Sequence, residues 1–210
     1  MTLPLSEALA LNPAEGGDLV GRLDPSFSNA PQASDPTKGA PFGGLMAALA
    51  AGAARQGLAI STPLQTLSIQ YLAAARFEEV TFRPSLTRGG RNVAYAHVLG
   101  GQDDRVAVQA LATFGRDVEG PVLTPLVAAP PPVDSLTATP MDPRFGPWFT
   151  RHIEHRFADG PRLFGENAGR SPELGCWMGC VDGAPLGERG LLFLLVGLYI
   201  GYVMIRSMLQ

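Results

Sequence analysis

The sequence has few cysteines, almost no lysine and little net charge. Cys176 and Cys180 are the only cysteines in 210 residues, which is too few for the disulfide framework of a secreted domain and fits a reducing compartment. The net charge is −3, Lys38 is the single lysine and the arginines are scattered, so no basic patch indicates a nucleic-acid partner. The first eleven residues include Glu7 and lack the basic start of a secretory signal. These features predict a cytoplasmic protein that binds no nucleic acid.

The sequence also lacks the motifs of several enzyme classes. It contains no Gly-x-Ser-x-Gly of a serine hydrolase, no Gly-x-Gly-x-x-Gly and no Walker-type phosphate loop. His152 and His155 are three residues apart, so on a strand they point to opposite faces, and together with Cys176 and Cys180 they lack the tight spacing of a zinc site. We therefore expect no metal and no cofactor.

Hydrophobic residues make up 46% of the sequence, enough for a substantial core, and the most apolar element is a predicted helix at residues 42–57. This segment is rich in alanine, leucine and methionine, contains no proline, and finishes with Arg55, Gln56 and Gly57, which are typical of a helix C-terminus. Because nearly every side chain in it is apolar or small, the helix must be covered on all sides. The alanines permit a sheet to curl closely around it.

Strand-like segments follow the predicted helix. Residues 64–74 alternate with Leu67, Ile69 and Tyr71 on one face, and residues 79–86 and 93–99 form a hairpin around Arg88-Gly89-Gly90-Arg91. In the second arm of this hairpin we expect Val93, Tyr95, His97 and Leu99 to share the apolar face, and residues 106–114 form another strand with alternate apolar residues. The short links predict an antiparallel meander, so the fold class is α+β with a sheet wrapped around the helix.

The helix starts with Pro41-Phe42-Gly43-Gly44, the most informative motif of the chain. The first N–H groups of a helix have no intrahelical acceptor and lie at the positive end of the helix dipole, where they can hold an oxyanion or a phosphate. Glycines at this place leave room for a ligand. The alternative is that Gly43 and Gly44 only form a tight turn into the helix.

The order and spacing of these segments resemble the first half of acyl-CoA thioesterases of the double hot-dog type, over roughly residues 15–116. The strings that carry the resemblance are Pro41-Phe42-Gly43-Gly44-Leu45-Met46-Ala47-Ala48-Leu49, Pro63-Leu64, Ser68-Ile69-Gln70-Tyr71-Leu72, Arg88-Gly89-Gly90-Arg91 and Ala110-Leu111-Ala112-Thr113-Phe114-Gly115. The resemblance implies a hot-dog fold, in which a curved antiparallel sheet wraps a central helix and two such units pair, with an acyl-CoA thioester bound between them.

The resemblance also implies roles for particular residues. Backbone N–H groups of Gly43 and Gly44, next to Phe42, are expected to polarise the thioester carbonyl. Arg88 or Arg91 is a candidate contact for the phosphates of CoA, but a solvated hairpin turn is the favoured interpretation of these arginines. Pairing of units predicts a homo-oligomer.

After Gly115 the composition changes to a proline-rich stretch, with prolines at 121, 125, 130, 131, 132, 140, 143 and 147. We therefore expect a complete hot-dog unit at residues 1–118, a linker at 119–148 and a partial second unit at 149–210. The second unit is expected to contain strands at 152–157 and 174–181, and an apolar C-terminal helix that starts after Glu188.

The second half departs from the family where the chemistry is expected. Thioester hydrolysis requires a group that activates water or attacks directly, and in the family an acid lies in the second central helix. Here Val196 follows the apolar run Leu191-Leu192-Phe193-Leu194-Leu195 with no acid after it, and Gly179 stands where an arginine is usual after Trp177. A catalytic residue is therefore unassigned. The chain ends at Gln210 without a second meander, so we expect a truncated or frameshifted second unit, which the coding sequence beyond Gln210 would reveal.

Residues 190–205 form a run of 16 uncharged residues between Arg189 and Arg206. As a helix this run spans about 24 Å, less than the roughly 30 Å of a bilayer core, so a membrane anchor is the alternative rather than the favoured interpretation.

Two functions are consistent with the sequence. One is an acyl-CoA thioesterase that releases a free acid and CoA, and the other is a catalytically inactive acyl-CoA-binding hot-dog protein that lacks the acid.

Overall fold

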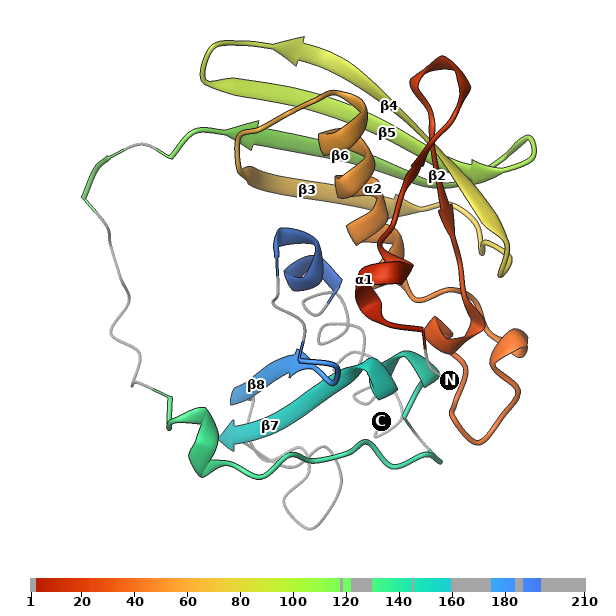
Figure 1. The fold of residues 1–210 in the computed structure, drawn as a ribbon, viewed down its shortest axis with the longest axis vertical. Helices are drawn as coiled ribbons and strands as arrows, with labels where there is room; N and C mark the ends of the chain where they lie inside the picture. The colour runs from red at the N-terminus through yellow and green to blue at the C-terminus, as the bar shows by residue number, and fades with distance from the viewer. Residues whose placement is uncertain are drawn as a thin grey trace.

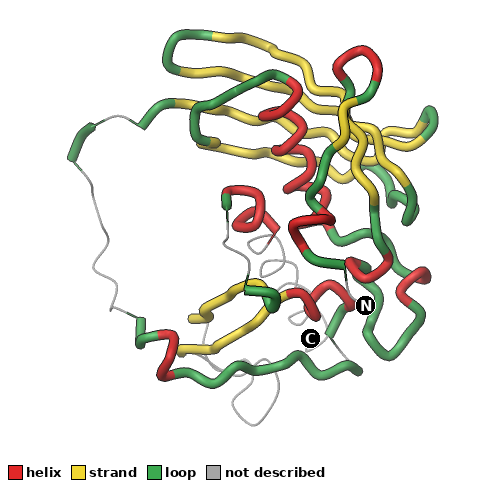
Figure 2. The backbone as a smooth tube through the Cα atoms, in the orientation of Figure 1, coloured by secondary structure: helices red, strands yellow, loops and turns green. Residues whose placement is uncertain are grey.

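The computed structural model describes residues 3–117, 119–121, 130–144, 146–159, 175–183 and 187–193. A six-stranded sheet curves around one long helix, and a separate two-stranded hairpin lies on the side of the helix that faces away from the sheet (Figures 1 and 2). The helices and strands are α1 (Leu5–Ala8), β1 (Asn12–Pro13), β2 (Leu19–Arg22), α2 (Gly43–Gly57), β3 (Leu64–Tyr71), β4 (Glu79–Gly89), β5 (Val93–Gln102), β6 (Arg105–Gly115), β7 (Ile153–Asp159) and β8 (Gly175–Cys180). This is the α+β architecture that the sequence predicts.

Helix α2 is the centre of the fold. It starts at Gly43 because Phe42 keeps an extended backbone, with φ −59° and ψ 133°, and all residues from Gly44 to Ala54 are buried. Large side chains from the helix and the sheet fill the space between them, among them Leu45, Leu49, Phe82 and Phe114, each fully buried. The prediction of a helix covered on all sides is confirmed.

The sheet has the strand order β1-β2-β4-β5-β6-β3, and every pair in it is antiparallel. Strands β4, β5 and β6 follow one another as in the predicted meander, but the predicted place of the first strand is wrong. Strand β3 does not pair with β4; it crosses over to pair with the outer side of β6. Strand β3 is therefore an edge strand. Strands β1 and β2 extend the sheet at its other edge. Like the four-residue helix α1, they are too short to give a periodic signal in the sequence.

The predicted face of β5 is wrong. Ala96 and Val98 are buried toward α2, whereas Val93 is 37% exposed and Tyr95 is 45% exposed. The small side chains face the helix because the alanine-rich surface of α2 allows the sheet to approach closely, and the larger ones point outward. The size of the side chains rather than their hydrophobicity decides which residues of β5 face the helix.

The chain beyond the proline-rich segment packs back against α2. The sequence predicts two strands here, and the structure adds that β7 and β8 pair antiparallel (Figure 1). Residues 188–193 are helical and run in the direction opposite to α2. Arg189 lies against Gly52 near the end of α2, and the carbonyl of Phe193 lies against Gly44 at its start. The division into units at 1–118, 119–148 and 149–210 stays a prediction.

Aromatic rings join the two parts of the chain at the start of α2. The ring of Phe42 stacks on Phe149, with centroids 3.7 Å apart, and meets Phe193 edge to face at 5.2 Å. Phe27 stacks on the imidazole of His152 at 3.7 Å and also meets Phe193 edge to face. All four phenylalanines are at most 4% exposed, so this aromatic cluster is a continuous core between the sheet unit and the second part.

An ion pair fixes the opposite end of α2. The guanidinium of Arg55 donates to both carboxylate oxygens of Glu188, and Glu188 Oε1 also accepts the backbone N–H of Leu64 at 2.6 Å. A second bond runs from Arg55 Nη1 to the carbonyl of Ile60. The start of the helical segment 188–193 is thus held to the end of α2 and to the start of β3.

Substituting alanine at Gly44 is expected to lower the free energy of unfolding by about 1–3 kcal/mol, because overpacking at a rigid site has no easy relief. A Cβ at Gly44 would lie 2.5 Å from the backbone oxygen of Phe193 and closer still to the ring of Phe42. The matched control is Gly179→Ala in β8, where no atom lies within 4 Å of the added Cβ. Urea unfolding of both variants measures the difference, and equal stability would show that Phe193 does not dock at Gly44.

Two buried histidines predict a loss of stability in mild acid. Burial lowers the pKa of His152 and of His155 below their ordinary value of 6.5. The unfolded chain then binds more protons than the folded one below about pH 6.5. As the pH is lowered, the free energy of unfolding therefore decreases by up to about 1.4 kcal/mol per pH unit for each histidine. His152→Phe keeps a ring on Phe27 but cannot titrate, and it should flatten the pH dependence of urea unfolding. An unchanged slope would contradict this role of His152.

Candidate functional site

Two backbone N–H groups at the start of α2 have no acceptor among the residues that the structure describes. The N–H of Phe42 donates to the carbonyl of Phe27 at 2.8 Å, and the N–H groups of Leu45 and Met46 donate back to the carbonyl of Phe42. Between them, the N–H groups of Gly43 and Gly44 make no hydrogen bond to any other group in the described parts of the chain. The first turn therefore offers donors at the positive end of the helix dipole, as the sequence indicates.

The space beside the two glycine Cα atoms is filled by the protein itself. A Cβ at Gly43 would lie 3.1 Å from the phenol of Tyr71, and one at Gly44 would meet Phe42 and Phe193. Glycine is thus needed for packing at Gly44, whether or not a ligand binds, whereas at Gly43 an added Cβ would only make a tight contact with the Tyr71 side chain. A role in binding rests on the N–H groups, and Gly43 is the better exposed of the two because Gly44 is buried.

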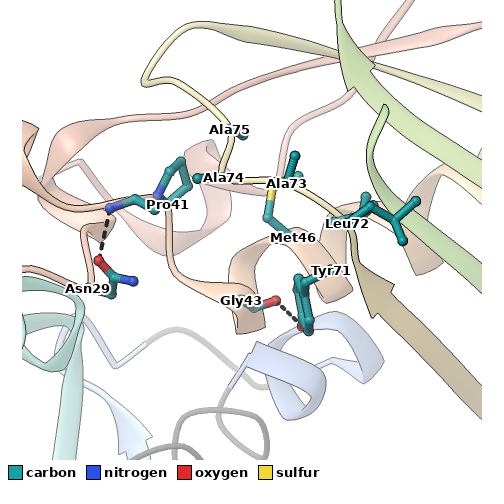
Figure 3. Close-up of a pocket in the computed structure, with 11 residues that line it drawn as sticks. Asn29, Pro41, Gly43, Met46, Tyr71, Leu72, Ala73, Ala74 and Ala75 are labelled. Carbon is teal, nitrogen blue, oxygen red and sulfur yellow. Dashed lines mark hydrogen bonds between the residues drawn. The ribbon is translucent and has the colours of Figure 1, made fainter. Parts of the chain in front are cut away.

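A pocket of about 320 Å³ opens beside Gly43 (Figure 3). Its walls come from the loop before α2, the first turn of α2, the end of β3 with the residues after it, and β6. The lining residues are Asn29, Ala40, Pro41, Gly43, Met46, Tyr71, Leu72, Ala73, Ala74, Ala75 and Val108. Apolar side chains dominate this lining, and ligand sites commonly combine such a surface with a few polar groups that fix orientation.

Asn29 supplies one of those polar groups, and its orientation is set by its own hydrogen bond. Its Oδ1 accepts the backbone N–H of Ala40 at 2.8 Å, which only the oxygen end of the amide can do. Its Nδ2 makes no hydrogen bond within the described residues and is therefore free to donate to a ligand. Figure 3 shows the amide beside Pro41, on the same side of the pocket as the start of α2.

Tyr71 supplies the other polar group. Its hydroxyl donates to the carbonyl oxygen of Gly43 at 2.8 Å, drawn as a dashed line in Figure 3. Burial raises the pKa of Tyr71 to about 12, so the phenol stays protonated and remains a donor over the whole physiological range. Because Gly43 O and Gly44 N belong to the same peptide group, this bond fixes the plane of the first peptide of the helix.

The sequence motif located the site but missed both of these side chains. Tyr71 is the last residue of β3 and was expected only to contribute to the apolar face of the predicted strand at 64–74, whereas Asn29 lies in an irregular loop that carries no periodic signal. The one signal for this contact is a tyrosine at the end of a strand, once the fold places that strand end beside the glycines that start α2. Nothing in the sequence around Asn29 indicates it.

The other predicted site residues lie away from the pocket. Phe42 is 1% exposed and belongs to the aromatic cluster rather than to the pocket wall. Arg88 lies in β4 and Arg91 in the following turn, next to the end of β6 where β3 begins. Tyr71 is at the other end of β3, about 23 Å along the strand. A contact of Arg88 or Arg91 with CoA phosphates stays a prediction.

No acidic residue and no histidine line the pocket among the described residues. Position 196, where the resemblance places a catalytic acid, and most of the apolar run 190–205 lie outside the described residues. The acid at the start of the second helix, Glu188, is paired with Arg55 near the far end of α2, about 18 Å along the helix from Gly43. The base of a hydrolytic reaction is therefore unassigned.

A second cavity of about 750 Å³ lies between the proline-rich segment and β7. His155, Glu154 and Arg151 line it, and Asp142 contributes a carboxylate. Arg144 bonds to this carboxylate and holds the pKa of Asp142 at about 2, and Arg156 pairs with Glu154, so two of these charges are already compensated. This cavity contains no helix N-terminus, and we do not assign it to thioester chemistry.

Two negative findings concern the described residues. In those ranges no three histidine, cysteine, aspartate or glutamate side chains come close enough together to hold a metal ion. Within the same part of the chain, no helix has the length and apolar character needed to cross a membrane.

Residues 31–115 match the family model of the acyl-CoA thioesterase N-terminal domain. This range includes the start of α2, the whole of α2, and strands β3 to β6, so it contains every residue of the pocket except Asn29. No sequence among curated proteins matches the chain.

Solved structures with the same fold cover nearly the whole chain. A conserved protein with a hot-dog fold from Alicyclobacillus acidocaldarius superposes with a TM-score of 0.78 at 23% identity, over 94% of this chain and 70% of that one. An acyl-CoA thioesterase II from Mycobacterium marinum and the tesB protein of Mycobacterium avium subspecies paratuberculosis each give a TM-score of 0.63 at 19% identity, over 91% of this chain. The chain spans 66% of each mycobacterial protein. The fold is therefore a hot-dog fold, as expected.

Replacing Tyr71 by phenylalanine removes only the hydroxyl that donates to Gly43. We expect the free energy of unfolding to fall by about 0.5–1.5 kcal/mol, the usual net value of one hydrogen bond. The amide resonance of Gly44 should shift in a two-dimensional ¹H–¹⁵N spectrum, because its peptide loses the bond at the carbonyl. A Gly44 resonance that stays in place would contradict the contact between Tyr71 and the first peptide of α2.

Proposed function

We propose that this protein is a thioesterase that hydrolyses acyl-CoA, with the thioester carbonyl held at the start of α2. One observation carries the proposal: Gly43, whose N–H has no acceptor within the described residues, lines an apolar pocket at the positive end of a buried helix. The match of residues 31–115 to an acyl-CoA thioesterase domain supports the choice of substrate class.

In the proposed reaction the chain's own groups stabilise charge on the thioester oxygen. Attack of water on the carbonyl carbon puts negative charge on that oxygen, and the C–S bond then breaks to release the acid while the CoA sulfur takes up a proton. The N–H of Gly43 donates to the developing oxyanion, and the helix dipole adds to the stabilisation. The Nδ2 of Asn29 is the second candidate donor, since its Oδ1 is held by Ala40.

A catalytically inactive acyl-CoA-binding protein is the alternative, and a specific observation favours it. The eleven residues around the pocket include no carboxylate and no imidazole, so nothing described here activates water beside the proposed oxyanion position. Binding of a thioester needs only the pocket and the donors. Hydrolysis needs a further group, which would come from residues outside the described ranges or from a second copy of the chain.

We further propose that the chain forms a homo-oligomer through the free edge of β3. This strand pairs only with β6, so the backbone groups along its other side have no strand partner in the described sheet. An open edge of this kind pairs readily with another strand.

We also propose a cytoplasmic location, with which the free thiols of Cys176 and Cys180 agree.

The oxyanion role is tested by Gly43→Pro with Gly43→Ala as the matched control. Both substitutions add a Cβ that meets the ring of Tyr71 at 3.1 Å, but only proline removes the N–H. Proline is tolerated at the first position of a helix, and the backbone of Phe42 already has the extended conformation that precedes a proline. We expect kcat of Gly43→Pro to be about 10²–10³-fold below that of Gly43→Ala, measured by thiol release from acyl-CoA.

Equal kcat values in the two variants would contradict the role of the Gly43 N–H. If the unmodified protein binds acyl-CoA without releasing CoA at any pH between 6 and 9, the enzyme is excluded and the binding protein is favoured. Circular dichroism and urea unfolding of both variants show whether α2 still forms, so a folding defect is recognised separately.

A further inference from the structure

The pocket beside Gly43 is closed at its inner end. Among its lining residues Met46 and Val108 are buried, at 3% and 1% exposed, and from this burial we infer that they form the floor. Behind Val108 the core has no free space: a Cβ at Gly100 would lie 2.7 Å from both Val108 and Phe82. A chain that enters at Gly43 therefore cannot continue into the sheet beyond this floor.

The volume of the pocket sets the length of chain that it can take. It measures about 320 Å³, close to the volume of ten water molecules at about 30 Å³ each. A methylene group is about as large as a water molecule, and the thioester group itself occupies part of this space. The remaining volume holds an aliphatic chain of up to about eight carbons.

The lining also determines whether a charged acyl group can bind in the pocket. None of the eleven lining side chains is charged, and the two polar ones, Asn29 and Tyr71, lie at the side of the pocket that contains the start of α2. Alanine, proline, glycine, methionine, leucine and valine form the rest. A carboxylate carried into this surface would lose its hydration without gaining a partner, which is costly.

We propose that this pocket is the acyl site and that it selects short to medium, uncharged aliphatic acyl groups, with Met46 setting the maximum length. The proposal rests on the proposed function, since it takes acyl-CoA as the ligand that enters at Gly43. It adds a limit of about eight carbons and the rejection of dicarboxylic acyl groups such as succinyl.

Binding of non-hydrolysable acyl-CoA thioethers to the full chain tests this selection independently of turnover. For saturated chains of two to twelve carbons, we expect Kd to fall about fourfold per methylene until about eight carbons and then to stop falling. The succinyl analogue should bind at least tenfold more weakly than the butyryl analogue. A Kd that does not depend on chain length, one that falls steadily to twelve carbons, or no binding at all would each overturn the proposal.

Met46→Ala deepens the pocket and should move the limit two to three carbons longer. Met178→Ala is the matched control, because Met178 packs on the core in β8 and does not line the pocket. Val108→Leu should move the limit in the opposite direction, so one informative variant remains if the other does not fold. An unchanged limit in a folded Met46 or Val108 variant would contradict the role of the floor.

Thiol release from the matching acyl-CoA series, measured in parallel, separates this inference from the proposed function. Chain-length-dependent binding without any CoA release would support the acyl site and exclude the hydrolase. CoA release that is indifferent to chain length and to Met46 would support the hydrolase and exclude the acyl site.

Discussion

The packing of Phe42 between Phe149 and Phe193 is the contact on which the rest of the structure depends. It determines where α2 begins, because the buried ring holds the residue before the helix in an extended conformation while Phe27 accepts its N–H. It also joins the two parts of the chain, since Phe149 and Phe193 come from beyond the proline-rich segment. The unpaired N–H of Gly43 follows directly after Phe42, so the geometry of the proposed site is a consequence of this aromatic cluster.

Both ends of α2 are tied to the second part of the chain. Phe193 closes over Gly44 at the start, and Glu188 binds Arg55 near the end. Small residues at Gly44 and Gly52 let the helical segment 188–193 approach closely. The two glycines of the motif therefore differ: Gly44 accommodates the second part of the chain, whereas Gly43 accommodates Tyr71, lines the pocket and is the residue whose N–H we propose as the donor. This division reconciles a turn into the helix with an anion-binding role, the two interpretations that the motif allows.

Much of the fold could be predicted from the sequence, because its signals are local. The alanine-rich run defines α2, alternation defines the strands of the meander, and the proline-rich stretch marks the change to β7 and β8. The inward face of β5 could not be read in this way, since Ala96 and Val98 face the helix while the larger Tyr95 points outward. The aromatic cluster and the Asn29 amide depend on residues more than a hundred positions apart or on loop geometry, and no pattern in the sequence indicates them.

The central claim is that an acyl thioester binds with its carbonyl oxygen at the start of α2. A crystal structure of the full chain with a non-hydrolysable acyl-CoA analogue that retains the carbonyl tests this most directly. We expect that oxygen within about 2.7–3.1 Å of Gly43 N, with the acyl chain running toward Met46 and Val108. An analogue bound instead in the cavity beside His155, or with its carbonyl away from Gly43, would show that the start of α2 is not the thioester site.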